Sequence, residues 1–222
     1  MRTLVIAPHA DDELLGCGGT LLRRREEGGV VGWLLVTSMN PGKSWSAERI
    51  EERNGEIDQV RRGLGVLPEH LFEMGLQAAE LDQIPTSELI GKISEVFVRF
   101  QPEEVLLPHA FDIHSDHRVV FDAAAACTKW FRYPSVKRVL AYETVSETDF
   151  ILKPEGHFIP TVFVDITSLI DRKIALMSIY ESEVDRHPFP RSEIALRAQA
   201  QSRGAQSGFG SAEAFQLLRE RV

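Results

Sequence analysis

The feature that most constrains the fold is a regular alternation of short apolar runs with longer segments of helical periodicity. The apolar runs have the length of β-strands and lie at Leu4–Ala7, Val30–Thr37, Leu71–Met74, Val105–Leu107, Val139–Tyr142 and Thr161–Val164. The helical segments lie near Glu13–Glu27, Ser46–Leu64, Ser87–Phe100, Arg118–Phe131, Ser168–Tyr180 and Ser192–Arg203. Strands that alternate with helices are typical of β-α units around a parallel sheet. The sequence therefore predicts a single-domain, Rossmann-like α/β sandwich of three layers with a mostly parallel sheet.

Length and composition narrow the class of protein. A chain of 222 residues without an internal repeat or a linker suits one domain, which we expect to span residues 1–222. No run approaches the ~20 apolar residues that a membrane-spanning helix needs. The first strand begins almost at once and acidic residues follow it, so we expect no secretory signal and a cytoplasmic protein. The net charge of −8 argues against a nucleic-acid partner, and a homo-oligomer is compatible with the sequence.

Two clusters of histidine and carboxylate residues follow directly after predicted strands. The sequence PHADDE occupies positions 8–13, at the end of the first strand. The second cluster lies within positions 108–117, after the fourth strand. In a doubly wound sheet, the first and fourth strands are often neighbours at the point where the strand order reverses, and ligands bind beyond their carboxyl ends. We therefore expect both clusters to open into one crevice.

The residue types in these clusters suit a divalent metal. A catalytic zinc site uses three nitrogen, oxygen or sulfur ligands and leaves a position for water, and two histidines with one carboxylate match that count. His114 and His117 are three residues apart, so one turn of helix would present both on one face. The remaining carboxylates, Asp11, Asp112 and Asp116, are then available as a base and as partners of the histidines. Capping and the helix dipole also favour acidic residues at a helix start, but they do not explain two such clusters.

Three other functions are compatible with parts of the pattern. A metal-dependent phosphoesterase would use two metals about 3.5–4 Å apart and would need more ligands than these clusters comfortably supply. A nucleotide-binding module would use the glycines of GCGGT at positions 16–20, but they lack the spacing of a dinucleotide-binding motif and follow acidic residues. A non-catalytic zinc-binding protein would keep the ligands and have no need of the additional acid and base groups.

The motifs resemble those of the LmbE-like, or PIG-L, family of zinc-dependent N-acetylglucosaminyl de-N-acetylases. PHADDE at 8–13, followed by GCGGT at 16–20, is similar to the family's H-P-D-D-E and G-x-G-G-T motifs, and HSDH at 114–117 is similar to H-P-D-H. Arg53 with Glu56, and AEAF at 212–215, resemble two weaker family patterns. Ala10 and Ser115 stand where the family usually has proline, and neither change removes a ligand. The resemblance therefore spans nearly the whole chain.

This resemblance implies a metal and a reaction. One zinc ion per chain would be bound by His9, Asp12 and His117. The activity would be hydrolysis of the amide of a small N-acetylated amino-sugar conjugate, which releases acetate and a free amine.

The resemblance also implies roles for the remaining polar residues of the clusters. Asp11 would be the general base, and His114 would stabilise the oxyanion or protonate the departing amine. Asp116 would orient His114, with Asp112 as the competing candidate. Arg53 would contact the sugar or its substituent, and Asp112 is a further candidate for substrate contact.

Overall fold

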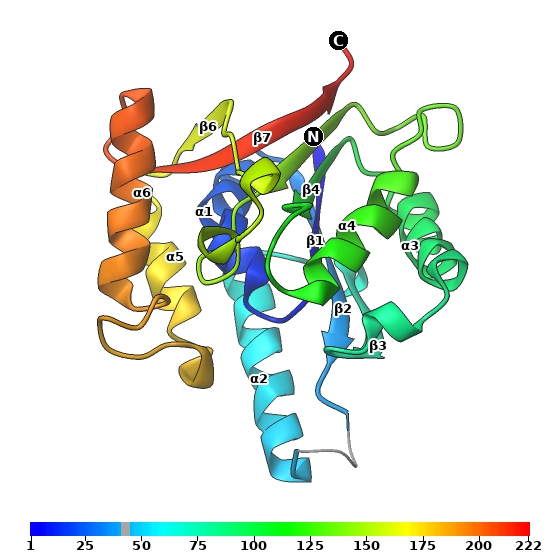
Figure 1. Cartoon of the computed structure of the whole chain (residues 1–222), viewed down its shortest axis with the longest axis horizontal. Helices are drawn as coiled ribbons and strands as arrows, with labels where there is room; N and C mark the ends of the chain where they lie inside the picture. The colour runs from blue at the N-terminus through cyan, green and yellow to red at the C-terminus, as the bar shows by residue number, and fades with distance from the viewer. Residues whose placement is uncertain (41–44) are drawn as a thin grey trace.

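A seven-stranded sheet forms the centre of the molecule, with helices on both faces (Figure 1). The computed structural model describes residues 1–40 and 45–222. The strands, in sheet order, are β3 (Leu71–Gln77), β2 (Val30–Ser38), β1 (Arg2–Ala7), β4 (Glu104–Pro108), β5 (Arg138–Tyr142), β7 (Ala212–Glu220) and β6 (Val162–Asp165). The α-helices are α1 (Asp12–Glu26), α2 (Ala47–Gly63), α3 (Thr86–Phe100), α4 (Ser115–Ala126), α5 (Ile170–Met177) and α6 (Glu193–Ser207). Strands β3, β2, β1, β4 and β5 are parallel neighbours, whereas β7 is antiparallel to both β5 and β6.

Two separate apolar layers hold the helices to the sheet. The first contains Leu21 of α1, Ile57 of α2 and Ile174 of α5, packed on one face. The second contains Ile93 of α3 and Val120 of α4, packed on the other. Figure 1 shows the same division, with α5 and α6 on the left of the sheet and α3 and α4 on the right. The predicted α/β sandwich is therefore confirmed. Among the described residues, no helix is long and apolar enough to cross a membrane.

Local chemistry explains where two of the helices begin and end. Ser46 caps α2, since its side chain accepts the backbone N–H of Arg49, and α2 stops just before Gly65, which adopts a φ of 70°. His114 caps α4, so this helix begins earlier than the predicted Arg118. It also ends at Ala126 and not at Phe131, because the chain turns after that residue.

Strand β7 was not among the predicted strands. Its sequence, AEAFQLLRE, is rich in residues that favour helices. It forms a strand because it pairs with both β5 and β6, and because its first four residues are buried between them. Tertiary pairing overrides local preference here.

The glycines after the first cluster allow α1 to pack closely on its neighbours. A Cβ atom on Gly16 would lie 2.2 Å from the ring of Tyr142, and one on Gly19 would lie 2.6 Å from the side chain of Ile166. Between them, Cys17 leaves helical geometry with φ −150° and ψ 20°, so α1 contains a kink. These glycines are therefore required for packing.

The kink in α1 is bound by a carboxylate from the opposite end of the chain. The backbone N–H groups of Gly19 and Thr20 donate to Glu213 of β7 at 2.8 and 2.7 Å. The Nζ atom of Lys173 donates to the same carboxylate at 2.7 Å. Because Glu213 already accepts these amides, the glycine-rich segment does not present them to a phosphate. The nucleotide-binding interpretation of the segment therefore has no support.

Candidate metal centre and active site

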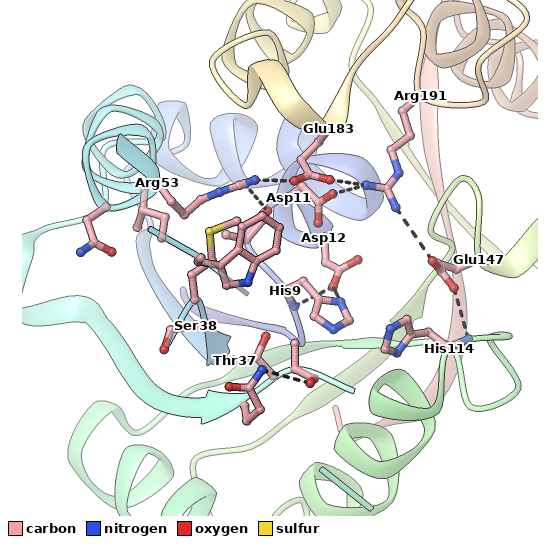
Figure 2. A pocket seen from close by; sticks show the side chains of 17 residues that line it. His9, Asp11, Asp12, Thr37, Ser38, Arg53, His114, Glu147, Glu183 and Arg191 are labelled. Atoms are coloured by element: carbon pink, nitrogen blue, oxygen red, sulfur yellow. Dashed lines mark hydrogen bonds and ion pairs between the residues drawn. The ribbon is translucent and has the colours of Figure 1, made fainter. Parts of the chain in front are cut away.

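The two polar clusters meet at one edge of the sheet, as the strand pattern predicts. Strands β1 and β4 are adjacent and parallel, with Leu4 opposite Val105. Their carboxyl ends therefore bring the segment after β1 next to the start of α4. A cavity of about 280 Å³ opens here, and residues of both clusters line it (Figure 2).

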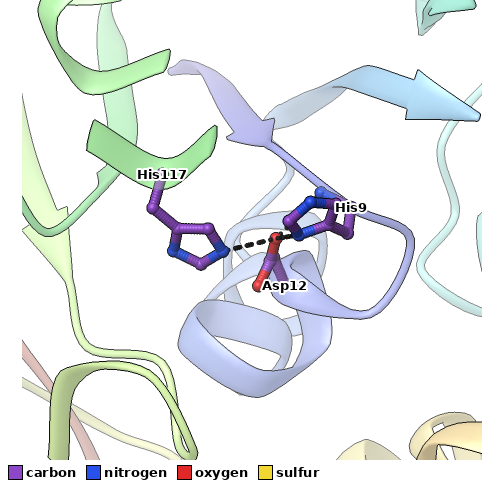
Figure 3. A group of neighbouring side chains, drawn as sticks. All are labelled: His9, Asp12 and His117. Carbon is purple, nitrogen blue, oxygen red and sulfur yellow. Dashed lines mark hydrogen bonds and ion pairs between the residues drawn. The ribbon is translucent and has the colours of Figure 1, made fainter. Parts of the chain in front are cut away.

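His9, Asp12 and His117 form a compact set of potential metal ligands (Figure 3). Nδ1 of His9 and Nε2 of His117 lie 3.3 and 3.2 Å from Oδ2 of Asp12. Within the described part of the chain, Nε2 of His117 is buried and has no hydrogen-bond partner. A buried polar atom without a partner is uncommon, and a metal would satisfy it. Two imidazoles and a carboxylate also suit zinc. These residues therefore fit a divalent metal.

Each of the two histidines in this set is paired with a second, fully buried carboxylate. Nε2 of His9 lies 3.0 Å from Oδ2 of Asp116, and Nδ1 of His117 lies 2.8 Å from Oδ2 of Asp112. Both aspartate side chains have 0% exposure. A carboxylate on the distal nitrogen orients a ligand histidine and makes it a better donor. The outer nitrogens of both histidines are therefore held, and the inner ones face Asp12.

These contacts differ from the roles that the resemblance suggested for Asp116 and Asp112. The carboxylate of Asp116 lies 3.9 Å from Nδ1 of His114, too far for a hydrogen bond, and it accepts the backbone N–H of Ala79 at 2.7 Å in addition to binding His9. Asp112 is enclosed between His117 and Thr148, whose Oγ1 donates to it at 2.6 Å, and so it is not placed to contact a substrate. We therefore assign Asp116 to His9 and Asp112 to His117, the two histidines of the potential ligand set.

His114 is oriented by a backbone group. The N–H of Asp116 donates to Nδ1 of His114 at 3.1 Å, as part of the cap of α4. Burial and the charge of His9 lower the pKa of His114. A neutral imidazole that accepts at Nδ1 carries its proton on Nε2. His114 can therefore act as a hydrogen-bond donor through Nε2.

Asp11 lies beside the ligand set at the N-cap position of α1. Its backbone has a φ of 148°, a region in which residues other than glycine are strained, and its N–H donates to Glu13 at 3.1 Å. Oδ2 of Asp11 accepts Nη1 of Arg191 at 2.6 Å. Burial, followed by the charge of Asp12, raises the pKa of Asp11 to about 7, although Arg191 acts in the opposite direction. The local backbone thus places a second carboxylate next to Asp12.

The electrostatics of the ligand set follow from its many close charges. Burial alone would lower the pKa of His9, but its hydrogen bonds with Asp116 and Asp12 outweigh this and raise the value to about 9. In the same way, Asp12 and Asp112 outweigh burial and raise the pKa of His117 to about 10. Burial would raise the pKa of Asp12, but the charge of His117 and the close contacts of Asp12 with both histidines hold it below its ordinary range. The carboxylates therefore make this pocket attractive to a cation.

Arg53 lines the cavity, as its proposed contact with the sugar requires, but its guanidinium is already occupied. The residue is only 4% exposed, and it donates to the carbonyl of Ala10 at 3.2 Å and to Glu183. Glu183, Arg191 and Glu147 also line the cavity, and none was a candidate from the sequence. Glu183 ends a short helical turn, and Glu147 and Arg191 lie in turns; none belongs to a recognisable motif, so no local signal points to them.

Comparison with known proteins places this site in a family. The sequence profile described as GlcNAc-PI de-N-acetylase, or PIG-L, matches residues 4–128, a segment that contains both polar clusters. The chain belongs to this family. The family assignment agrees with the resemblance seen in the sequence motifs.

Individual relatives extend the likeness over the whole chain. Diacetylchitobiose deacetylase of Thermococcus kodakarensis is 26% identical over 240 residues, which cover 98% of this chain and 83% of the relative. The crystal structure of a conserved protein of Thermus thermophilus has a TM-score of 0.79 and 28% identity, covering 99% of this chain and 96% of that one.

A third relative shows that the fold alone does not determine the reaction. The crystal structure of 4-carboxy-2-hydroxymuconate hydratase from Pseudomonas putida KT2440 has a TM-score of 0.77 at 20% identity, covering 100% of this chain and 98% of the hydratase. Identity this low shows the fold alone, and the fold is shared by a hydratase and a deacetylase. The activity of this chain must therefore be argued from its site.

Proposed function

We propose that this chain is a zinc-dependent hydrolase that removes acetyl from an N-acetylated amino sugar, and that residues 1–222 form one such domain. The observation that carries the proposal is the position of Asp11. This carboxylate lies beside the ligand set of His9, Asp12 and His117, yet it is bound by Arg191 and not included in the set. A site that only held a metal would have no use for a second carboxylate fixed in a strained backbone.

His9, Asp12 and His117 would hold one zinc ion. When bound, zinc supplies Lewis acidity, which polarises a carbonyl oxygen and makes a water molecule more acidic. The buried carboxylates of Asp112 and Asp116 keep the two ligand histidines in orientation.

The residues around the ligand set divide the proton transfers between them. Arg191 occupies Oδ2 of Asp11, so we assign proton uptake from the attacking water to Oδ1. The water oxygen bonds to the acetyl carbon, and Nε2–H of His114 donates to the oxygen that gains charge. The C–N bond then breaks, the nitrogen receives the proton that Asp11 had taken up, and a free amine leaves together with acetic acid, which loses its proton to solvent and becomes acetate.

Two alternatives fit the site less well. A phosphoesterase with two metals would need two independent ligand sets. Among the described residues, the second cluster that could hold a metal is His9, His114 and Asp116, and it shares His9 with the first. A non-catalytic zinc protein would leave the positions of Asp11 and His114 unexplained.

The test is acetate release by the zinc-loaded protein from a panel of N-acetylglucosamine conjugates. We expect release from at least one conjugate, loss of release after chelation, and recovery with one equivalent of zinc. The matched control is Asp11→Asn, loaded with zinc in the same way. Absence of acetate from every conjugate, with one zinc bound per chain, would contradict the proposal.

A further inference from the structure

Two arginines and two carboxylates form a continuous chain of ion pairs along one wall of the cavity (Figure 2). Arg53 of α2 contacts Glu183, and Glu183 accepts Nη1 of Arg191 at 3.0 Å. The same nitrogen of Arg191 donates to Asp11 at 2.6 Å. Glu183 is therefore the residue that joins the two arginines.

Each of the three nitrogens of the Arg53 guanidinium lies close to a protein oxygen, although Nε makes no hydrogen bond. Nε lies 3.1 Å from Oε2 of Glu56, Nη1 donates to the carbonyl of Ala10 at 3.2 Å, and Nη2 donates to Ser182 at 2.9 Å as well as to Glu183. Binding an anion through Arg53 would require one of these contacts to break.

Two of the three nitrogens of the Arg191 guanidinium donate hydrogen bonds to protein groups, and the third lies beyond hydrogen-bond distance of its nearest acid. Nε donates to Oγ of Ser146 at 2.9 Å, Nη1 is shared by Asp11 and Glu183, and Nη2 lies 3.9 Å from Glu147. The protein's own acids thus surround this second arginine too.

The charged side chains of the cavity wall also include more acids than arginines. Its charged side chains other than the histidines are four acids, namely Asp11, Asp12, Glu147 and Glu183, and the two arginines. The rest of the wall offers neutral hydrogen-bonding groups, among them Ser38, Asn54 and Gln77, and the ring of Trp45, which is 46% exposed. Within the described residues, this wall therefore offers hydroxyl, amide and aromatic contacts for a sugar but no arginine or lysine without an acidic partner.

We propose that Glu183 makes this site selective for uncharged amino-sugar conjugates, because it neutralises the two arginines that would otherwise bind an anionic group. The inference rests on the proposed function, since it concerns the substrate of the same cavity. An anionic conjugate would have to separate Glu183 from an arginine or lie unpaired beside Glu147 and Glu183. A neutral glycoside neither breaks these ion pairs nor places a negative charge beside the two glutamates. Glu183 is thus a specificity-determining residue, and conjugates that carry a phosphate or carboxylate near the sugar are disfavoured.

The experiment compares methyl N-acetyl-α-glucosaminide with N-acetylglucosamine 1-phosphate and 6-phosphate on the zinc-loaded protein. Binding is measured by calorimetry with His114→Ala, which leaves the chain of ion pairs intact, and acetate release is measured with the active protein. We expect the neutral sugar to exceed both phosphates by about tenfold or more in affinity and in kcat/KM. In Glu183→Gln the arginines become available, so the ratio should fall by about tenfold in favour of the phosphates.

The matched control is Glu181→Gln. Glu181 lies on the same short helical turn as Glu183, but it is exposed and does not line this cavity. Glu181→Gln removes the same negative charge, but from an exposed position outside the cavity. The ratio of neutral to phosphorylated sugar should therefore stay at the wild-type value. Circular dichroism of each variant checks that it is folded.

The outcomes separate this inference from the proposed function. If the neutral sugar binds more tightly and no conjugate releases acetate, the deacetylase function fails and the charge selectivity holds. If the wild-type protein binds or hydrolyses a phosphorylated sugar as well as the neutral one, the selectivity is refuted, whatever the reaction. An equal change of the ratio in Glu181→Gln and Glu183→Gln would also refute it, as would failure of the neutral sugar to bind at all.

Discussion

Replacing Asp112 by asparagine tests the buried partner of His117, a proposed metal ligand. Oδ2 of Asp112 lies 2.8 Å from Nδ1 of His117, and its other oxygen accepts the hydroxyl of Thr148 at 2.6 Å. Asparagine has a single oxygen, so it can satisfy only one of these two donors, and its amide adds a donor where an acceptor is needed. Metal affinity should fall because His117 loses either its orientation or part of its basicity.

The size of the effect follows from the burial of the pair. Loss of such a partner lowers metal affinity by about 10- to 100-fold, or roughly 1.4 to 2.8 kcal/mol. The side chains of Asp112 and His117 are 0% and 1% exposed, whereas His9, the partner of Asp116, is 24% exposed. Because solvent can partly replace a lost partner at His9, Asp112→Asn should lie at the upper end of this range and Asp116→Asn at the lower end.

The assay is competition for zinc between each variant and a chromophoric chelator of known affinity. Asp122→Asn removes an exposed carboxylate from α4, the helix that carries His117, and should leave the affinity for zinc unchanged. Thr148→Val removes the second contact of Asp112, together with the acceptor of the Thr144 backbone N–H, but leaves His117 untouched and should have little effect on zinc. A folded Asp112→Asn protein that binds zinc as tightly as the wild type would refute the assigned role of Asp112.

Three further predictions test other parts of the structure. Asp11→Asn should retain one zinc ion and lose about 100- to 10,000-fold in turnover, as expected for a lost general base, and loss of zinc in this variant would exchange the roles of the two adjacent aspartates. His114→Ala should also retain zinc and have a lower kcat, because its ring donates to the substrate and is not needed to hold the ion; equal kcat values for variant and wild type would contradict this role. Glu213→Ala should lower the free energy of unfolding by about 3 to 5 kcal/mol in urea titrations, because it leaves buried Lys173 unpaired. Adding Lys173→Met to that variant should restore part of the loss, and no recovery would contradict the ion-pair explanation.

The parts of the fold that the sequence predicts are those in which local pattern and tertiary structure agree. The apolar runs that become β1 and β4 are followed by histidines and acids, and the general topology of parallel sheets is enough to bring those ends together. Strand β7 is different, because residues such as Leu217 and Leu218 also have a high helix propensity. Only its pairing with β5 and β6 makes it a strand.

The candidate site also has parts that the sequence predicts and parts that it does not. The resemblance of the motifs implies His9, Asp12 and His117 as metal ligands, but it cannot say which histidine each neighbouring aspartate will contact. Asp116 is two residues from His114, yet its carboxylate reaches His9, since the cap of α4 turns its side chain toward β1. Arg191 is 180 residues from the Asp11 side chain that it binds, and no local pattern connects two such positions.

The bond between Glu213 and α1 has a consequence for the order in which the protein matures. Glu213 lies 194 residues after Gly19, whose amide it accepts. A nascent chain therefore exposes the helix that carries Asp12 long before the carboxylate that completes its kink has been synthesised. Until then, two backbone amides of α1 must remain in water or find a temporary acceptor. His9 and Asp12, two of the proposed metal ligands, are thus synthesised well before Glu213, which supports the helix that carries Asp12.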